Sequence, residues 1–198
     1  MTWLQRIIYI IFKRPYYSVI LGRFGKGSKL IDPILTGSSR IFIGQGVYIR
    51  KHTWLAADPL TGSAECSLTI GDGTYVGHFC HLYATKSISL GKHVLLADRV
   101  YVTDNVHEYQ DIHKPIMHQP VKQLKPVTIG DGVWLGENVC IIGASIGKNS
   151  VIGANAVVTA DIPDYCVAVG SPARIIKRYD RTTESWRRTD PSGHFIEC

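Results

Sequence analysis

A six-residue period runs through the middle of the chain and limits what the chain can fold into. "IGDGTY" and "VGHFCH" follow one another from Ile70, "IGDGVW" and "LGENVC" from Ile129, and "IGKNSV" and "IGANAV" from Ile146. An aliphatic residue opens each block, and a glycine often comes next. Neither the two-residue alternation of a surface strand nor the 3.6-residue period of a helix produces this pattern.

A short strand followed by a turn, repeated every six residues, places each leading aliphatic side chain in one interior column. Three blocks make a coil of about eighteen residues, and stacked coils make a parallel β-helix. Glycine after the aliphatic residue suits a turn in which a side chain would crowd the backbone. Because each coil buries its apolar edge only against its neighbours, several are needed, and the pattern predicts about five coils.

The charge of the chain is concentrated at its ends. Hydrophobic residues make up 45% of the 198 residues and charged residues 19%, which is typical of an ordered globular protein. Residues 1–29 carry a net charge of +6, residues 30–173 carry −2 and residues 174–198 carry +2. A nucleic-acid groove requires a basic stripe with aromatic residues across the folded core, so we expect no nucleic-acid partner.

The cysteines indicate the compartment. Five are present, none in a C-x-x-C pair, and an odd number leaves one unpaired in any complete disulfide scheme. We interpret them as thiols that act as small apolar residues in a reducing environment, which predicts a cytoplasmic protein.

The N-terminal segment, residues 1–29, is predicted to be helical. Apolar residues recur at helical spacing at Leu4, Ile7, Ile8 and Ile11. The uncharged run Ile7–Phe12 is too short to span a bilayer, no signal-peptide cleavage site follows it, and Pro15 is expected to end the helix. Two interpretations remain open: the helix packs on its own protein or a neighbouring subunit, or it lies peripherally on the inner face of the membrane.

The six-residue period fails between Val102 and Val127. The intervening "TDNVHEYQDIHKPIMHQPVKQLKP", residues 103–126, is polar and contains three prolines, so it cannot continue the apolar column. We expect it to project as a loop. Loops held by a rigid scaffold are common positions for catalytic residues.

These repeats, and the segment "VIGANAVVTADIPDYCVAVGSPARIIKRY" after them, resemble the hexapeptide-repeat acyltransferases. The resemblance covers roughly residues 40–178 and includes galactoside and maltose acetyltransferases and bacterial surface-polysaccharide acetyltransferases. It implies an all-β fold: a left-handed parallel β-helix with an N-terminal helical extension and a protruding catalytic loop, active as a homotrimer. The expected acyltransferase domain is 30–178, followed by a tail, 179–198, that forms a short helix or is disordered.

The loop resembles the family pattern Asp-x-x-His-x-x-x-Asp followed by Pro-Ile. By that match His107 is the general base, since a histidine suits the removal of a proton from an attacking hydroxyl or amine near neutral pH. Asp104 or Asp111 would orient its imidazole. Many relatives have a histidine in place of Asn105, which is assigned to the substrate. The alternative is a solvated polar loop in which His107 is no more special than the other histidines.

The resemblance also implies that coenzyme A lies along the helix wall near the C-terminal coils. The implied cofactor-binding residues are Trp134, Gly136, Gly153, Ala154, Thr159, Arg174 and Lys177. The tryptophan lies beside the thioester, the small residues leave room for pantetheine, and the two cations suit the phosphates. The alternatives are an outward tryptophan that packs on the loop and surface salt bridges for the cations. Glu137 and Ala160 depart from the serine and lysine of galactoside acetyltransferase.

His78 falls where galactoside acetyltransferase has an acceptor-binding asparagine. It either contacts the acceptor or is a histidine on the coil surface whose hydrogen bonds are satisfied within the protein.

The predicted function is transfer of an acetyl group from acetyl-CoA, without a metal, to a sugar hydroxyl of a glycan or lipid-linked saccharide. One alternative is a nucleotide-sugar N-acetyltransferase. Another is a zinc-dependent hydratase of the γ-carbonic-anhydrase kind, with His113, His118 and either His78 or His81 as ligands. A third is an inactive scaffold that only trimerises.

Overall fold

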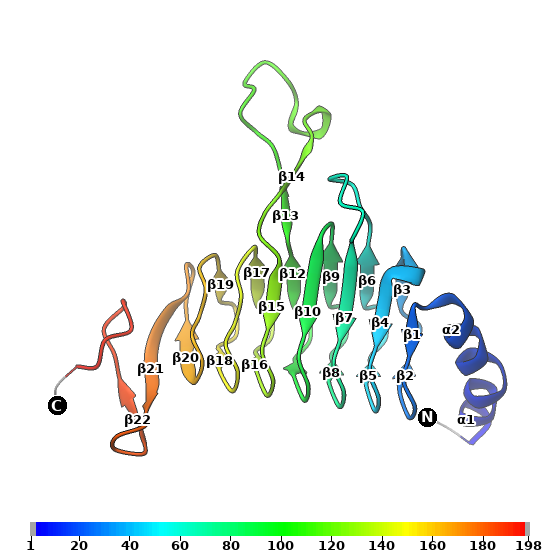
Figure 1. The fold of residues 1–198 in the computed structure, drawn as a ribbon, viewed down its shortest axis with the longest axis horizontal. Coiled ribbons are helices and arrows are strands. Elements are labelled where there is room, and N and C mark those ends of the chain that lie inside the picture. The colour runs from blue at the N-terminus through cyan, green and yellow to red at the C-terminus, as the bar shows by residue number, and fades with distance from the viewer. Residues whose placement is uncertain (1–2, 197–198) are drawn as a thin grey trace.

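Three parallel sheets run along the molecule and enclose one core (Figure 1). The computed structural model describes residues 3–196. Sheet A contains, in spatial order, β1 (Arg23–Phe24), β4 (Ile41–Ile43), β7 (Ser67–Ile70), β10 (Ser87–Leu90) and β15 (Val127–Ile129). Sheet B begins with β2 (Lys29–Leu30), β5 (Tyr48–Ile49), β8 (Tyr75–Val76), β11 (Leu95–Leu96), β16 (Trp134–Leu135), β18 (Val151–Ile152) and β20 (Cys166–Val169). Sheet C contains β3 (Ile34–Thr36), β6 (Trp54–Ala57), β9 (His81–Ala84), β12 (Tyr101–Thr103), β17 (Cys140–Ile142) and β19 (Val157–Val158).

The register of the strands explains the six-residue period. In sheet A, Ile41 pairs with Leu68, Leu68 with Ile88, and Ile88 with Val127, and all four side chains are completely buried. Each such side chain contributes about 1.5–3 kcal/mol by leaving water. The interior aliphatic column predicted from the repeats is therefore confirmed.

Each coil passes from sheet A to sheet B to sheet C, which defines an A–B, a B–C and a C–A corner. The B–C corner of six coils contains a residue with positive φ in place of glycine, beginning with Asp32 between β2 and β3. The other five are His52, Phe79, Arg99, Asn138 and Asn155. Because each corner has the same backbone shape, the residues beside these positions form straight lines along the molecule.

The first coil lies earlier than the repeats indicate. β1 pairs with β4 from Arg23 onward, and β2 pairs with β5, so the coils begin ahead of the predicted boundary at residue 30. Sheet C has six strands, one more than the number of coils expected from the period. The additional coil, β1 to β3, is held by the ladder hydrogen bonds of its neighbour although its own sequence lacks the six-residue pattern.

The N-terminal helical segment consists of α1 (Trp3–Ile8), a π-helical turn η1 (Tyr9–Lys13) and α2 (Arg14–Ile20). The prediction that Pro15 ends the helix is wrong, because Pro15 lies in the first turn of α2, where its missing N–H is not needed. Tyr9 and Tyr17 are buried, and the Tyr9 hydroxyl accepts a hydrogen bond from the Leu30 N–H at 2.9 Å. This side of the segment packs on its own protein, as one of the two interpretations expected.

No helix in residues 3–196 has the length and apolar character needed to cross a bilayer. A short 3₁₀-helix, η2 (Ser38–Arg40), joins the first coil to the second.

The predicted loop is present as a projecting hairpin at the C–A corner between β12 and β15 (Figure 1). Its stem is the antiparallel pair β13 (Asn105–His107) and β14 (Val121–Gln123), and its outer part contains the 3₁₀-helix η3 (Ile116–His118). The stem pairs His107 with Val121. It places the loop away from the apolar column, as the polar composition requires.

The C-terminal segment differs from the predicted short helix or disordered tail. β21 (Arg174–Asp180) pairs antiparallel with β20, and β22 (Ser185–Arg188) pairs antiparallel with β21. The backbone groups of β20 that face away from β18 would otherwise be unpaired, so the hairpin covers this exposed sheet edge. The side chains of Tyr179 and Trp186 contact each other edge to face, with ring centroids 5.7 Å apart.

Candidate active site

His107 ends the first strand of the projecting hairpin. Its side chain is exposed, and none of the hydrogen bonds formed within residues 3–196 engages its imidazole. Asn105 lies two residues earlier on the same strand, so the two side chains leave the strand on the same side. The histidine predicted as general base is thus held at the stem of a loop and is accessible to a substrate.

Asp104 does not orient His107, which corrects one of the sequence predictions. Its carboxylate is fully buried and accepts hydrogen bonds from the Thr85 N–H at 2.7 Å, the Thr85 hydroxyl at 2.9 Å, and the N–H groups of Lys86 at 2.8 Å and Ser87 at 2.7 Å. These four donors occupy both carboxylate oxygens. Asp104 therefore fastens the start of the hairpin to the preceding coil.

Asp111 has a similar local role at the tip. Its Oδ1 accepts a hydrogen bond from the His113 N–H at 3.0 Å, and its Oδ2 lies 3.6 Å from the Lys114 ammonium. The predicted contact between Asp111 and His107 is absent from the described part of the chain. Within one subunit, neither proposed carboxylate holds the imidazole.

The base of the hairpin contains a polar contact that the sequence did not reveal. Gln123 donates a hydrogen bond to the Asp104 carbonyl oxygen at 2.8 Å and accepts one from the Thr85 hydroxyl at 3.0 Å. Asn105 donates more weakly to the Tyr83 carbonyl oxygen at 3.4 Å. Because these contacts join the hairpin to Tyr83 and Thr85 of the preceding coil, the position of the hairpin is defined by side chains far apart in sequence.

Trp134 and Lys177 lie on one line across the outer face of sheet B. Trp134 pairs with Val151, Val151 with Val167, and Val167 with Lys177. Three strand spacings separate the ends of this line, a distance of about 14 Å. Trp134 is 49% exposed, and Lys177 and Arg174 are also exposed. No salt bridge to either cation is present among residues 3–196, so the predicted ion-pair alternative finds no partner there.

Gly136 and Gly153, at the B–C corner, are needed for one coil to stack on the next. This reason is separate from the predicted one, which is room for pantetheine. A Cβ added to Gly136 would lie 2.6 Å from the backbone N of Ala154, and one added to Gly153 would lie 2.8 Å from Cγ1 of Val169. These glycines are therefore required by the stacking of one coil on the next. Glu137, which departs from the family serine, forms a salt bridge with Arg99 of the preceding coil.

The predicted site residues fall into two groups, one at the C–A corner of the coil and one on sheet B and at the B–C corner. Thr159 directly follows β19 and so lies at the C–A corner, the same corner from which the His107 hairpin projects. We call His107, Asn105 and Thr159 the hairpin cluster. The wall cluster lies on sheet B and at the B–C corner and comprises Trp134, Gly136, Gly153, Ala154, Arg174 and Lys177. A single subunit does not bring the two clusters together.

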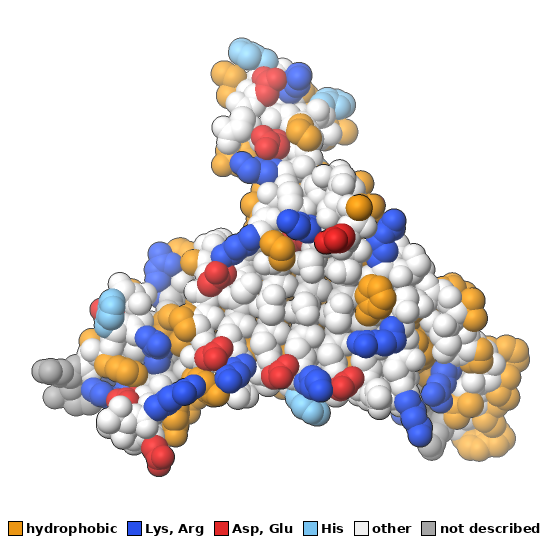
Figure 2. Space-filling view, viewed as in Figure 1, with side chains coloured by type: hydrophobic (Ala, Val, Ile, Leu, Met, Phe, Trp, Pro, Cys, Tyr) orange, Lys and Arg blue, Asp and Glu red, His pale blue; other side chains and the backbone are white. Residues whose placement is uncertain are grey.

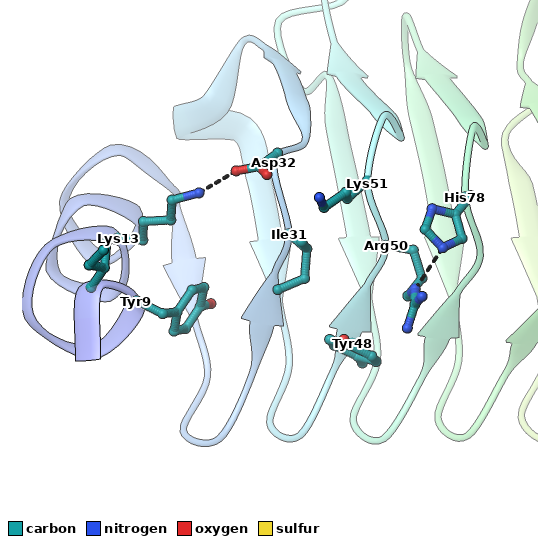
Figure 3. A pocket seen from close by; sticks show the side chains of 9 residues that line it. Tyr9, Lys13, Ile31, Asp32, Tyr48, Arg50, Lys51 and His78 are labelled. Carbon is teal, nitrogen blue, oxygen red and sulfur yellow. Dashed lines mark hydrogen bonds and ion pairs between the residues drawn. The ribbon is translucent and has the colours of Figure 1, made fainter. Parts of the chain in front are cut away.

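His78 follows β8 at the B–C corner, on the side of the wall cluster. Its Nε2 accepts a hydrogen bond from Arg50 Nε at 2.9 Å (Figure 3). Its backbone N–H donates to Asp98 at 2.8 Å. An Nε2 atom that accepts leaves the ring proton on Nδ1. His78 also lines a cavity of about 450 Å³ between the N-terminal helical segment and the first three coils.

The three buried cysteines, Cys66, Cys80 and Cys166, are not suited to carry an acyl group. Burial raises the pKa of the Cys66 thiol and of the Cys80 thiol to about 11, and it also raises the pKa of Cys166. Thiols with raised pKa values form little nucleophilic thiolate near neutral pH. Across residues 3–196, no three His, Cys, Asp or Glu side chains are grouped as ligands for a metal ion.

Comparison with known proteins agrees with this architecture. A family model described as the hexapeptide repeat of succinyl-transferase matches residues 126–160. Rv3034c of Mycobacterium tuberculosis, named as an acetyltransferase, is 34% identical over 86% of this chain, which spans 60% of that relative. WcaF of Escherichia coli, named as a colanic acid biosynthesis acetyltransferase, is 31% identical over 68% of each chain.

The fold is also that of AntD, an N-acyltransferase from Bacillus cereus that was crystallised with dTDP and 3-hydroxybutyryl-CoA. The likeness has a TM-score of 0.72, at 20% identity, and covers 86% of this chain and 90% of that one. The repeat match, the similarity to WcaF along more than two thirds of its length and the shared coil fold agree with one another. The chain belongs to the hexapeptide-repeat acyltransferase family.

Proposed function

We propose that this protein transfers the acetyl group of acetyl-CoA to a hydroxyl group of a saccharide. The observation that carries the proposal is an exposed histidine, His107, on a hairpin that interrupts a hexapeptide-repeat coil. The names of the acetyltransferase relatives support the acyl group, and the colanic acid relative supports a saccharide acceptor.

The proposed reaction occurs in a complex that holds both substrates. His107 removes the proton of the acceptor hydroxyl as its oxygen attacks the thioester carbonyl carbon. The tetrahedral intermediate then expels the coenzyme A thiolate, which takes the proton from the imidazolium. Backbone N–H groups at coil turns are suitable donors to the negatively charged oxygen of the intermediate. No cysteine is needed as an acyl carrier, which is consistent with the raised pKa values of the buried thiols.

We further propose that the complete site forms between subunits of a homotrimer. The separation of the hairpin cluster from the wall cluster supports this, because a head-to-tail ring would bring the C–A corner of one subunit beside sheet B of the next. His107 and Thr159 would then come from one subunit, and Trp134, Arg174, Lys177 and the corner glycines from its neighbour. The left-handed sense of the coil remains a prediction from the family resemblance.

In this arrangement acetyl-CoA lies along the wall cluster. Trp134 packs beside the pantetheine, and Arg174 and Lys177 bind phosphate oxygens, for which cationic donors are well suited. His78, at the neighbouring corner, contacts the acceptor. We place this activity in the coil domain, with the N-terminal helical segment and the C-terminal hairpin as additions to it.

The proposal is tested by incubating the purified protein with acetyl-CoA and a panel of saccharide acceptors and measuring the release of free thiol. Acceptor-dependent release is expected, and the His107→Ala variant should be slower by about a hundredfold or more, the scale of general-base catalysis. His113→Ala, which changes an exposed histidine in the same loop, is the matched control. Equal rates for the wild type and His107→Ala would contradict the proposal. Thiol release only with amino-sugar acceptors would show that the protein acetylates an amine rather than a hydroxyl group.

A further inference from the structure

The cavity beside His78 has two walls of different origin (Figure 3). Ile8, Tyr9 and Lys13 line it from the helical segment. The coils contribute Ile31, Asp32, Tyr48, Arg50, Lys51 and His78. Ile8 and Lys13 are five residues apart, and the π-helical turn between them, with its i to i+5 hydrogen bonds, places them on the same side. The irregular turn thus shapes the cavity.

Arg50 is held in the cavity by groups without charge. Its Nε donates to His78 at 2.9 Å, and its guanidinium carbon lies 5.6 Å from the centre of the Tyr48 ring. No carboxylate within residues 3–196 forms a salt bridge with it. A fixed guanidinium whose charge is not neutralised is suited to bind a phosphate through two parallel hydrogen bonds.

The coil itself does not require an arginine at this position. Later coils have Gly77, Ala97 and Gly136 at the equivalent place after the buried residue of sheet B. At Gly77 and Gly136 the residue is small because the next coil stacks closely on it. Arg50 therefore departs from the repeat, and the stability of the coil does not explain this departure.

The cavity carries a net positive charge. Lys51 is exposed without a salt-bridge partner in the described chain, whereas Lys13 is paired with Asp32. Three cations and one carboxylate line the cavity, which leaves a balance of two positive charges. A diphosphate linkage, with one negative charge on each phosphate, matches this balance.

An exposed apolar surface adjoins the cavity. Ile8 lines the cavity and is 41% exposed, while Trp3, Phe12 and Val19 of the same helical segment are 77%, 67% and 84% exposed. Figure 2 shows hydrophobic side chains gathered at this end of the molecule. Residues 1–29 contain six basic and no acidic residues, so the surface is also attractive to anionic lipid.

We propose that this cavity binds the diphosphate of a lipid-linked saccharide, with the lipid chain lying along the exposed apolar face of the helical segment. The inference rests on the proposed function, since the saccharide would be the acetyl acceptor and His78, which lines the cavity, is the residue proposed to contact it. It specifies the acceptor: a saccharide carried on a lipid diphosphate, recognised by Arg50 and Lys51 at the phosphates and by apolar side chains at the lipid.

The test measures binding to the full-length protein without acetyl-CoA, using farnesyl diphosphate as a soluble lipid diphosphate. Inorganic pyrophosphate, farnesol and UDP-glucose separate the contributions of phosphate, lipid and nucleotide. We expect farnesyl diphosphate to bind about tenfold or more tightly than each of the three. Arg50→Ala should weaken the binding of farnesyl diphosphate and of pyrophosphate by about tenfold. Phe12→Ser should weaken only that of farnesyl diphosphate.

Arg99→Ala is the matched control, because Arg99 lies at the same B–C corner but is paired with Glu137. It should leave farnesyl diphosphate binding unchanged. Thermal unfolding checks that each variant is folded, and Lys51→Ala replaces Arg50→Ala if the latter is not. Equal affinity of the wild type and the Arg50 and Lys51 variants, or UDP-glucose binding as tightly as farnesyl diphosphate, would overturn the inference. Acetyl-CoA binding is titrated separately. Absence of acetyl-CoA binding would count against the proposed function and not against the diphosphate site.

Discussion

The carboxylate of Asp104 accepts two hydrogen bonds from Thr85, one from its N–H at 2.7 Å and one from its hydroxyl at 2.9 Å. Both residues are completely buried. This pair links the first residue of the projecting hairpin to the end of sheet C in the preceding coil. The position of His107, three residues later, depends on this link rather than on a direct contact with the carboxylate.

Replacing Asp104 should therefore affect stability first. Asp104→Ala leaves the buried N–H group of Thr85 and the part-buried N–H groups of Lys86 and Ser87 without their acceptor, which should cost about 2–4 kcal/mol of unfolding free energy. Chemical denaturation measures this loss, with Asp111→Ala as the control in the exposed outer part of the hairpin. A change within about 0.5 kcal/mol would show that the contacts contribute little.

Trp134→Ala should weaken the binding of acetyl-CoA by about tenfold, because it removes the exposed aromatic face of the wall cluster. Trp186→Ala is a suitable control, since Trp186 lies on the same sheet and is 46% exposed, compared with 49% for Trp134. Isothermal titration with acetyl-CoA gives both affinities. An unaltered affinity in the Trp134 variant would remove this residue from the proposed cofactor path.

Mixed oligomers test whether the site is shared between subunits. His107→Ala is expected to be slower by about a hundredfold, and Trp134→Ala to keep about a tenth of the activity at low acetyl-CoA concentration. Unfolded and refolded together, the two variants should reach about a quarter of the wild-type activity, above the level of either variant alone. This fraction follows because one interface in four of a random head-to-tail mixture joins an intact His107 to an intact Trp134. Separately refolded variants mixed afterwards are the control. No recovery in co-refolded samples of confirmed mixed composition would contradict a shared site.

His81 should make stability depend on pH. Its ring stacks on Trp54 with centroids 4.3 Å apart, and burial lowers its pKa below the ordinary value of 6.5. Its buried Nε2 finds no hydrogen-bond partner among residues 3–196. Because the folded state disfavours the protonated ring, the associated stability is present above pH 6.5 and is lost as the pH falls from there towards the folded-state pKa.

His81→Phe should therefore lose less stability than the wild type between about pH 7 and pH 5. Unfolding by urea at several pH values measures this difference. His113→Gln, in the exposed part of the hairpin, should retain the wild-type dependence. If the wild type and His81→Phe lose stability in parallel, the buried ring is not the source of the effect.

Local patterns were sufficient for the parts of the molecule that repeat. The leading aliphatic residues predicted the buried columns, and the loss of the period after Val102 predicted the projecting loop that carries His107. Such patterns work because each coil contacts only its neighbours, so the same local requirements recur every six residues.

Two other predictions failed, one for a local reason and one because of a distant contact. Pro15 was expected to end a helix, but it begins a new helical turn that packs through Tyr17 on the coil. The tail was expected to be helical or disordered, but an exposed sheet edge was available for β21 to pair with. Pro15 is tolerated because the first turn of a helix does not need its N–H, whereas the tail pairs because a sheet edge elsewhere in the chain outweighs its local preference.

The sequence alone determined the coil, the loop and the residue types that suit acyl transfer, because these follow from periodicity and from side-chain chemistry. Only the tertiary structure decided that Asp104 is buried in structural hydrogen bonds, that Thr159 and Trp134 lie at different edges, and that Arg50 meets His78 beside the helical segment. The physical reason is that stacking brings together residues one or more coils apart, at corners whose relative positions no single repeat encodes.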